Sequence, residues 1–508
     1  MAQNKRSIHK TKVALMTGAG ALLALAPHVR ADESVDRLLN KLEQKGVLTA
    51  DEADELKTEN TADQTNNVSQ APASIWKISN TFKSINLFGD LRLRYEYRGV
   101  DNLPGASPNT FYRERFRYAL RFGIRGDLVD NFYYGLRLET STNPRSPWAT
   151  FGNNTTAGSV TPSDKAQSGI GVGQAFIGWH PESWLDITAG RMPMPLYITP
   201  MVWDSDINPE GAFERFKYTV DDVDLFVDMG QFDYQDPSSA SAFPSSDTFI
   251  LAWQAGGLVR LNESTSFKIA PVVYTYAGDG TSGGLNQPFV GQGNAAGANP
   301  GVPGGAGVTP PGPTDYNEEG LDHLLVLEVP AEFDFKIPAT PMGAMHGRLF
   351  GDFAYNFEGN ERADAAFNAN PAAFPGLTGP VHGQAIAYQA GIGFGSEGPV
   401  YGPTQGLVYG STSKKNTWEA RFYWQHIEQY ALDVNLIDSD FFEGRGNLQG
   451  FYASFAYSFT DAIIGTVRIG YADRINDNLG TGGNNLDIPG INPIKYYKLL
   501  QTDLTWRF

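Results

Sequence analysis

Hydrophobic and charged side chains alternate strictly in the stretch GDLRLRYEYRG, residues 89–99. Every second position is apolar or aromatic, namely Leu91, Leu93, Tyr95 and Tyr97. The positions between and beside them hold Asp90, Arg92, Arg94, Glu96 and Arg98. Because successive side chains of a strand point to opposite faces of a sheet, this period of two predicts a β-strand with one apolar and one charged face.

The next segment, YRERFRYALRFGIRGDL, repeats this pattern. Its apolar face would consist of Phe116, Tyr118, Leu120, Phe122 and Ile124. Its opposite face would consist of Arg113, Arg115, Arg117, Arg121 and Arg125. Glycine is frequent (56 residues) and aromatic residues make up 12% of the chain, as expected of an all-β protein with many turns.

Similar runs recur to the end of the chain and predict sixteen strands. They are expected at 85–98, 112–127, 132–141, 171–180, 185–191, 213–220, 223–232, 247–260, 266–276, 321–334, 345–357, 383–395, 416–428, 449–459, 463–474 and 495–508. Short polar turns alternate with long loops rich in Gly, Pro, Asn and Ser. One connection departs from this alternation, because residues 396–415 should form a short turn and are too many for one.

This alternation favours a transmembrane antiparallel β-barrel over a soluble β-sandwich. A sandwich would bury its apolar face against a second sheet and have loops of similar length at both ends. A barrel in a membrane has an apolar outside, a polar inside, an even number of strands, short turns at one end and long loops at the other. With about sixteen strands, it would enclose an aqueous channel.

The start of the chain has a different character. Four cations, an apolar run and the small residues around Ala31 predict a secretory signal peptide over residues 1–31, although a retained anchor is an alternative. Residues 32–75 are expected to form a short periplasmic helical segment and a linker, and residues 76–508 the barrel. Removal of five cations with the signal peptide would change the net charge from −17 to −22, which disfavours nucleic acid as a partner. Cysteine is absent, which excludes disulfides and thiolate metal sites.

The sequence resembles bacterial outer-membrane porins of the putative-porin and phosphate-selective-porin-like families. The resemblance depends on LLNKLEQKGVLTADEADEL ahead of the barrel, on AGRMPMPLYITPMVWDSDINPEG after the fifth strand, and on the terminal aromatic residue Phe508. It implies a channel for passive diffusion of small hydrophilic solutes in the outer membrane of a Gram-negative bacterium. The implied partners are membrane lipid, lipopolysaccharide and two further copies of the chain in a homotrimer.

Porin resemblance also implies that the third long loop, at about 192–212, folds into the barrel and narrows it. Its carboxylates would then face the arginines of the first two strands, and such charges select ions in pores. The candidate pore-lining residues are Arg92, Arg94, Arg113, Arg115, Arg117, Arg121, Arg125, Arg191, Asp204, Asp206 and Glu210. Alternatively, the arginines form structural ion pairs with Asp90, Glu96, Glu114 and Asp127. Anion or cation preference stays open.

Other functions have less support in the sequence. The histidines after the signal peptide stand in separate segments, and no nucleophile motif or metal-spaced pair accompanies them, so no enzyme and no cofactor are expected. A barrel that encloses a multihaem cytochrome partner is an alternative. The acidic segment DSDFFEG, residues 438–444, could bind divalent cations and bridge lipopolysaccharide, or be a solvated loop.

Overall fold

The structure is a computed structural model, and its barrel unit spans Ser79–Phe508. It describes residues 80–104, 109–141, 146–152, 169–235, 248–278, 323–341, 343–369, 371, 377–396, 414–481 and 494–508. The predicted signal peptide and helical segment lie outside the described residues. No helix in these ranges is long and apolar enough to cross a membrane.

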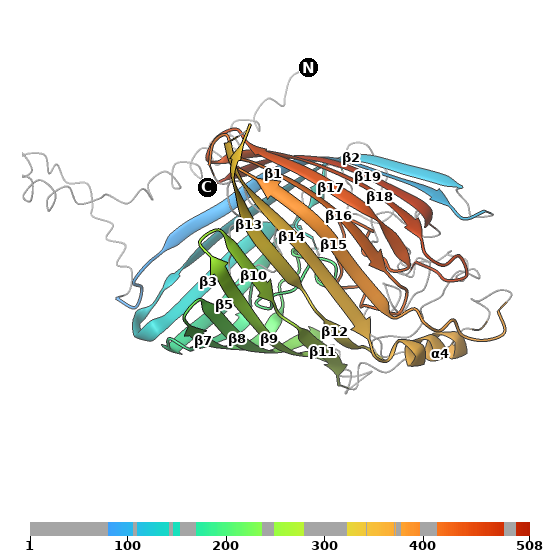
Figure 1. Ribbon diagram of the computed structural model, residues 1–508, viewed down its shortest axis with the longest axis horizontal. Helices are drawn as coiled ribbons and strands as arrows, with labels where there is room; N and C mark the ends of the chain where they lie inside the picture. Colours follow the sequence, from blue (N-terminus) through green and yellow to red (C-terminus); the bar gives the residue numbers. More distant parts are fainter. Residues whose placement is uncertain are drawn as a thin grey trace, which may run out of the picture. The chain divides into compact units, whose positions relative to one another are not determined.

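Antiparallel strands make up most of the described chain (Figure 1). They are β1 (Asn86–Asn102), β2 (Thr110–Asp127), β3 (Phe132–Thr140), β4 (Ala149–Thr150), β5 (Ile170–Glu182), β6 (Leu185–Arg191), β7 (Glu210–Val220), β8 (Val223–Gln235), β9 (Thr248–Asn262), β10 (Thr265–Ile269), β11 (Val272–Ala277), β12 (Leu325–Glu328), β13 (Ala331–Thr340), β14 (Gly343–Asn356), β15 (Ile386–Gly395), β16 (Trp418–Ile427), β17 (Leu448–Ser458), β18 (Ile463–Arg474) and β19 (Ile494–Arg507). One α-helix, α4 (Gly359–Ala369), lies between β14 and β15, and the short 3-10 helix η2 (Val129–Asn131) forms the turn between β2 and β3.

These segments form a closed barrel of sixteen strands, which confirms the predicted fold class and strand number. β10 and β11 are two parts of one strand, because both pair with β9, and β12 and β13 are likewise two parts of the strand that pairs with β14. Each interruption contains a proline, Pro271 or Pro330, which has no N–H group for the ladder. The two-residue β4 pairs with β2.

The barrel closes where β19 pairs with β1. At the end of this seam, the Gly89 N–H group donates to the Phe508 carbonyl at 2.9 Å, and the Phe508 N–H group donates to the Gly89 carbonyl at 3.1 Å. A Cβ atom at Gly89 would lie 2.6 Å from the Phe508 ring, so the terminal ring needs a glycine beneath it.

The connections largely follow the predicted alternation of short and long. Between β7 and β8 only Asp221 and Asp222 intervene, and Asp221 has the left-handed φ of 49° that suits a tight hairpin. The long connection that departed from the pattern joins β15 to β16, and residues 397–413 of it lie outside the described ranges.

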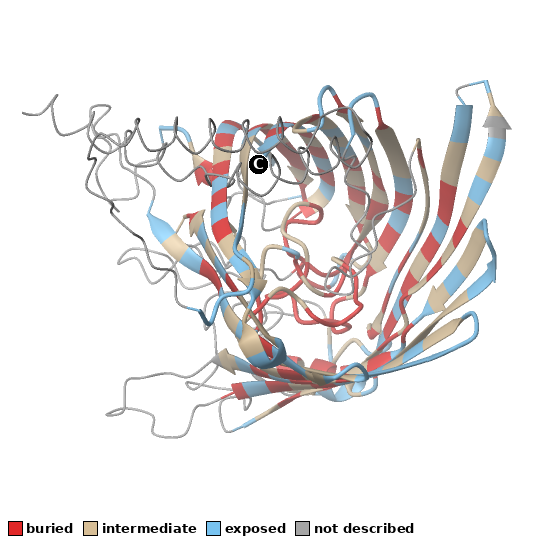
Figure 2. Ribbon diagram, turned by 90° about the vertical axis from the view of Figure 1, so that its left-hand side faces the viewer, coloured by how far each residue is buried: buried red, intermediate tan, exposed pale blue. Residues whose placement is uncertain are grey.

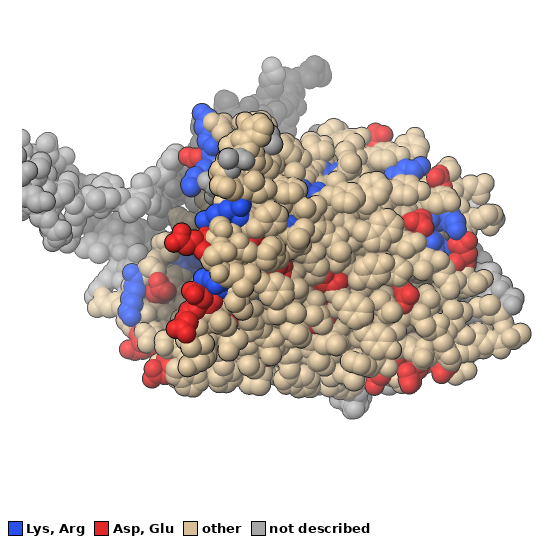
Figure 3. Space-filling view, viewed as in Figure 1, with Lys and Arg blue, Asp and Glu red and all other residues tan. Residues whose placement is uncertain are grey.

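The two faces of the strands are as the alternation predicted. Phe116 is 59% exposed and Leu120 is 40% exposed on the outside, whereas Arg117 between them is 5% exposed. On the face shown in Figure 3, the outer surface is mostly uncharged across its middle, and most charged residues lie toward its margins. This arrangement suits a barrel whose outside contacts lipid.

Two long connections lie inside the barrel (Figure 2). We call residues 192–209, between β6 and β7, lumenal loop 1, and residues 428–447, between β16 and β17, lumenal loop 2. Apolar residues of both loops form one buried cluster with inward-facing residues of the wall. The cluster includes Leu196, Tyr197, Met201, Leu432, Leu436, Phe441, Phe442, Tyr274, Tyr423 and Tyr452. Part of the lumen is therefore filled by the chain itself, and not by water as the strand number alone suggested.

Candidate functional site in the barrel lumen

The candidate site begins with the charged face of β1 and its two neighbours. The register places Arg94 opposite Asp503 of β19 and opposite Arg117 of β2. Arg94 donates from Nε to Asp503 Oδ1 at 2.7 Å and from Nη2 to Asp503 Oδ2 at 2.9 Å. Such a bidentate pair fixes the plane of the guanidinium group and leaves Nη1 to point into the lumen.

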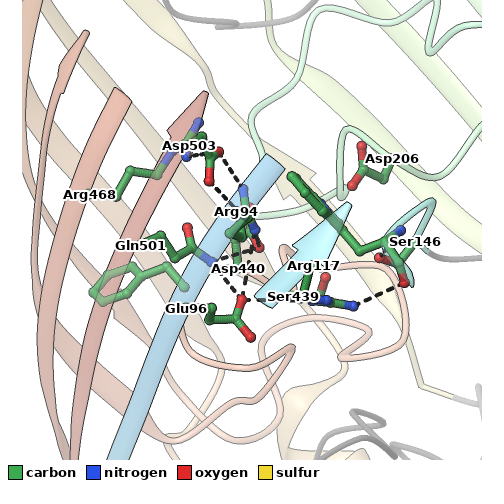
Figure 4. A network of polar contacts seen from close by, with 12 residues as sticks. Arg94, Glu96, Arg117, Ser146, Asp206, Ser439, Asp440, Arg468, Gln501 and Asp503 are labelled. Carbon is green, nitrogen blue, oxygen red and sulfur yellow. Dashed lines mark hydrogen bonds and ion pairs between the residues drawn. The ribbon is translucent and has the colours of Figure 1, made fainter. Parts of the chain in front are cut away.

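Glu96 lies at the centre of this wall and is fully buried. Its carboxylate accepts hydrogen bonds from Arg115 Nε at 2.5 Å, from Arg98 Nη2 at 3.1 Å and from Gln501 Nε2 at 3.0 Å. Nitrogens of Arg117 and Arg94 lie 3.7 and 3.8 Å from it. One carboxylate thus joins four guanidinium groups, so part of the arginine ladder has the structural ion pairs that the alternative interpretation expected. Figure 4 shows Glu96 with Arg94, Arg117 and Gln501 around it.

Lumenal loop 1 is the predicted inward loop, and it ends at Pro209 because Glu210 already begins β7. Its first half is bound to the wall on the far side of the barrel from β1. The Tyr197 N–H group donates to Gln254 Oε1 at 2.7 Å, and Gln254 Nε2 donates back to the Tyr197 carbonyl at 2.8 Å. The Thr199 N–H group donates to Glu328 at 3.2 Å, and the Thr199 hydroxyl donates to Asp352.

The second half of lumenal loop 1 returns to the arginine wall. Asp206 accepts a hydrogen bond from Arg121, so this predicted loop carboxylate is in direct contact with a predicted wall arginine. Asp204 binds lumenal loop 2. Its Oδ2 atom accepts from the Ser439 N–H group at 3.0 Å and from the Ser439 hydroxyl at 2.8 Å.

Lumenal loop 2 was not predicted as a part of the site. Its Asp440 carboxylate accepts from Arg94 Nη1 at 2.7 Å and from Gln501 Nε2 at 3.1 Å. On the other side, Asp433 Oδ2 accepts from the hydroxyls of Tyr234 and Tyr276, both at 2.9 Å. One sequence feature could have identified this loop as part of the site. The segment YALDVNLIDSDFF, residues 430–442, has an apolar content that is unusual for a solvated loop.

The segment 438–444 is accordingly not a solvated loop, because Phe441 and Phe442 are buried in the lumen. Among the described residues, no group of three or more carboxylate, histidine or cysteine side chains is placed to hold a metal ion.

The two lumenal loops also bind each other through their backbones. The Asp204 N–H group donates to the Leu436 carbonyl at 2.5 Å, and the Asp438 N–H group donates to the Pro200 carbonyl at 2.9 Å. With the Asp204–Ser439 contacts, these bonds make the loops one unit that extends from the β1 wall to the β9, β12 and β14 wall.

Two of the three aspartates of lumenal loop 2, Asp438 and Asp440, have pKa values that are shifted in opposite directions. Burial opposes the ionisation of Asp440, but Arg94, Arg98 and Arg468 outweigh it and hold the Asp440 pKa below its ordinary value. Burial, followed by the charges of Asp204 and Asp440, raises the Asp438 pKa well above its ordinary value. Asp440 is therefore the anionic partner of the arginine wall.

Of the remaining predicted residues, Arg92 lies on the wall beside Asp90, and the others lie at the margins of this site. Arg92 donates from Nε to Asp90 at 2.7 Å. Arg113 lies on β2 toward the connection with β1, and Arg125 is exposed with its guanidinium carbon 4.9 Å from the Phe88 ring. Arg191 and Glu210 bind each other at the base of lumenal loop 1, away from the cluster around Glu96.

No curated protein matches this chain. Among solved structures, the outer membrane channel DcaP of Acinetobacter baumannii is 13% identical, with 84% of this chain and 97% of that chain covered and a TM-score of 0.39. A mutant of the Rh. blastica porin is 9% identical, with 84% of this chain and 100% of that chain covered and a TM-score of 0.36. Residues 100–294 match the family of putative porins, which confirms the resemblance predicted from the sequence and points to an outer-membrane channel rather than an enzyme.

Proposed function

We propose that this chain is a passive channel for small hydrophilic or charged solutes, and that its narrowest part lies where the two lumenal loops meet the arginine wall of β1 and β2. The observation that carries this proposal is the direct contact of both loops with that wall, through Asp206–Arg121 and Asp440–Arg94. A solute that crosses the barrel has to pass beside this contact.

The chemistry of the narrow part would select solutes by size and charge. Guanidinium and carboxylate groups alternate there, and lumen-facing charges keep water in the path while apolar solutes are disfavoured. Arg92, Arg468 and Asp440 remain partly exposed, so they are the charges that a passing ion would meet most directly. Movement through such a path needs no energy source beyond the solute gradient.

The lumenal loops also favour this function over an electron-conduit sheath. A cytochrome inside the barrel would need the space that the buried loop residues Met201, Leu436 and Phe441 occupy. It would also need to break the contacts of Asp440 with the wall. A water-filled path beside the loops requires neither change.

We further propose a homotrimer in the outer membrane of a Gram-negative bacterium, with lipid and lipopolysaccharide around it. Chemical crosslinking of the protein in native membranes, followed by denaturing electrophoresis, should give a ladder that ends at three subunits. A ladder that ends at one or two subunits would contradict the trimer and leave the channel proposal untouched.

Single-channel recording tests the channel proposal directly. Purified full-length protein that migrates faster when unheated than when boiled, as a folded barrel does, should insert into a planar bilayer. It should then produce discrete and stable conductance steps in potassium chloride. The same preparation after boiling is the control and should give none. Folded protein that inserts into liposomes but conducts no ions would contradict the proposal.

A further inference from the structure

Two carboxyl groups in the wall hold lumenal loop 1 without a basic partner. Glu328 ends β12, Asp352 lies on the neighbouring β14, and the register pairs Glu328 with Ala354, two residues beyond Asp352. The side chains of Glu328 and Asp352 are buried, at 0% and 3% exposure. Thr199 of lumenal loop 1 bridges them, since its N–H group donates to Glu328 and its hydroxyl donates to Asp352.

The two carboxyl groups lie close to each other, because both bind the same threonine. A hydrogen bond between them would require one shared proton, since neither carboxylate has a hydrogen to donate when both are ionised. In addition, one oxygen of each group, Glu328 Oε2 and Asp352 Oδ1, receives no hydrogen bond from the described residues. A proton between the two groups would satisfy acceptors that are otherwise unpaired in a buried site.

The surroundings offer little to stabilise two negative charges. Tyr274 on β11 is a titratable group close to both carboxyl groups, and it is not a cation. Gln389 on β15 lies opposite Asp352 in the register and is uncharged. In the described part of the chain, neither Glu328 nor Asp352 forms an ion pair with Lys, Arg or His.

We propose that Glu328 and Asp352 share one proton and act as a proton-dependent latch, which holds lumenal loop 1 against the wall and releases it as the pH rises. This inference rests on the proposed channel function, because release of the loop would widen the path. When the shared proton leaves, two like charges remain in a buried site, and contact with water relieves their repulsion only if the loop moves away.

The direction of the effect follows from proton linkage. The latched form holds one proton more than the released form, so a rise in pH shifts the equilibrium toward release. Above the pH at which the water-exposed pair of the released form ionises, and until the latched pair ionises as well, each further pH unit should favour the released form by about tenfold. Below that pH, the latch should be insensitive to acid until other groups titrate.

Conductance as a function of pH is the first test. The wild-type channel should spend more time in a larger conductance state as the pH rises from 5 to 9. Glu328→Gln supplies a permanent amide donor of the same shape and carries no charge, so this variant should stay in the smaller state throughout. Thr199→Val removes the bridging hydroxyl and should populate the larger state at lower pH than the wild type. The same pH dependence in the wild type and Glu328→Gln would overturn the latch.

Thiol labelling tests the latch without ion conduction. The chain has no cysteine, so Val202→Cys places a single thiol at a buried position of lumenal loop 1. The rate of labelling by a charged maleimide is compared between Val202→Cys and Val202→Cys/Glu328→Gln, in protein shown to be folded by its migration. The rate for Val202→Cys divided by the rate for Val202→Cys/Glu328→Gln is independent of the titration of the thiol and of Asp438, because both variants contain these groups. This ratio should rise severalfold between pH 6 and 9. A constant ratio would overturn the latch, whereas a rising ratio without any conductance would support the latch and contradict the channel.

Discussion

Arg94 of β1 and Asp440 of lumenal loop 2 form an ion pair of 2.7 Å inside the barrel. The same guanidinium group binds Asp503 of β19, so one side chain joins the closing seam of the barrel to a loop in the lumen. The position of the loop and the integrity of the seam are therefore coupled through Arg94.

Loss of the Asp440 carboxylate should loosen lumenal loop 2. Asp440→Asn removes the charge that Arg94 and Gln501 bind, and hydrogen bonds to charged groups each contribute about 1.5–3 kcal/mol. The variant should show larger conductance fluctuations and faster cleavage of the loop by an added protease. Asp477→Asn is the matched control, because Asp477 binds Lys495 in an exposed pair and should leave both readouts unchanged.

Acid should remove the contribution of Asp440 only at low pH. Because the Asp440 pKa is lowered in the folded protein, its contribution to loop docking is fully present above the unfolded-state pKa of about 3.9 and is lost as the pH falls through the folded value. The difference in protease cleavage between Asp440→Asn and the wild type should thus be unchanged between pH 7 and 5 and should shrink below pH 4 with an acid-active protease. A loss of this difference already at pH 6 would contradict this assignment.

The centre of the arginine wall should be sensitive to the loss of its carboxylate. Glu96→Gln leaves four guanidinium groups without their shared buried anion, and breaking a buried pair in this way costs about 3–5 kcal/mol. Thermal unfolding in detergent should occur at a clearly lower temperature. Asp224→Asn breaks the exposed pair with Arg260 and should cost at most about 1 kcal/mol. Equal falls of the unfolding temperature in both variants would mean that water reaches the ion pairs around Glu96.

The outer face should tolerate charge only near its margins. Leu120→Arg places a charge among lipid and should cost about 2–4 kcal/mol if Leu120 lies near the bilayer midplane. Val220→Arg, next to the turn at Asp221, should cost about 0–1 kcal/mol because it lies near the interface. Reversible folding into lipid vesicles measures both free energies. Equal free-energy costs for the two substitutions would mean that the depths of Leu120 and Val220 in the bilayer are assigned wrongly.

The Arg121–Asp206 pair allows a matched test of ion selectivity. Arg121→Gln removes the ion-pair partner of Asp206 and should move the reversal potential in a salt gradient toward cation preference. Asp206→Asn removes the nearest carboxylate of Arg121 and should move the reversal potential toward anion preference. Both shifts should weaken at high salt, because the screening length is about 8 Å at 0.15 M and shorter above it. Unchanged reversal potentials in both variants would place the selective region elsewhere in the barrel.

Local sequence was enough to determine the barrel. The period of two in segments such as Leu91–Tyr97 assigns each side chain to lipid or lumen, because the membrane imposes the same alternation on every strand. Turn residues such as Asp221 and Asp222 mark the strand ends, so sixteen strands and their faces could be predicted from short stretches alone.

Only the tertiary structure decided which charges meet. Arg94 and Asp503 are 409 residues apart, and Arg98 and Glu443 are 345 residues apart, so no local pattern pairs them. The same holds for Thr199, Glu328 and Asp352, which come together because barrel closure and the path of lumenal loop 1 place them there. Local alternation sets the direction of a side chain, but its partner depends on the register around the whole barrel and on the loops that fill it.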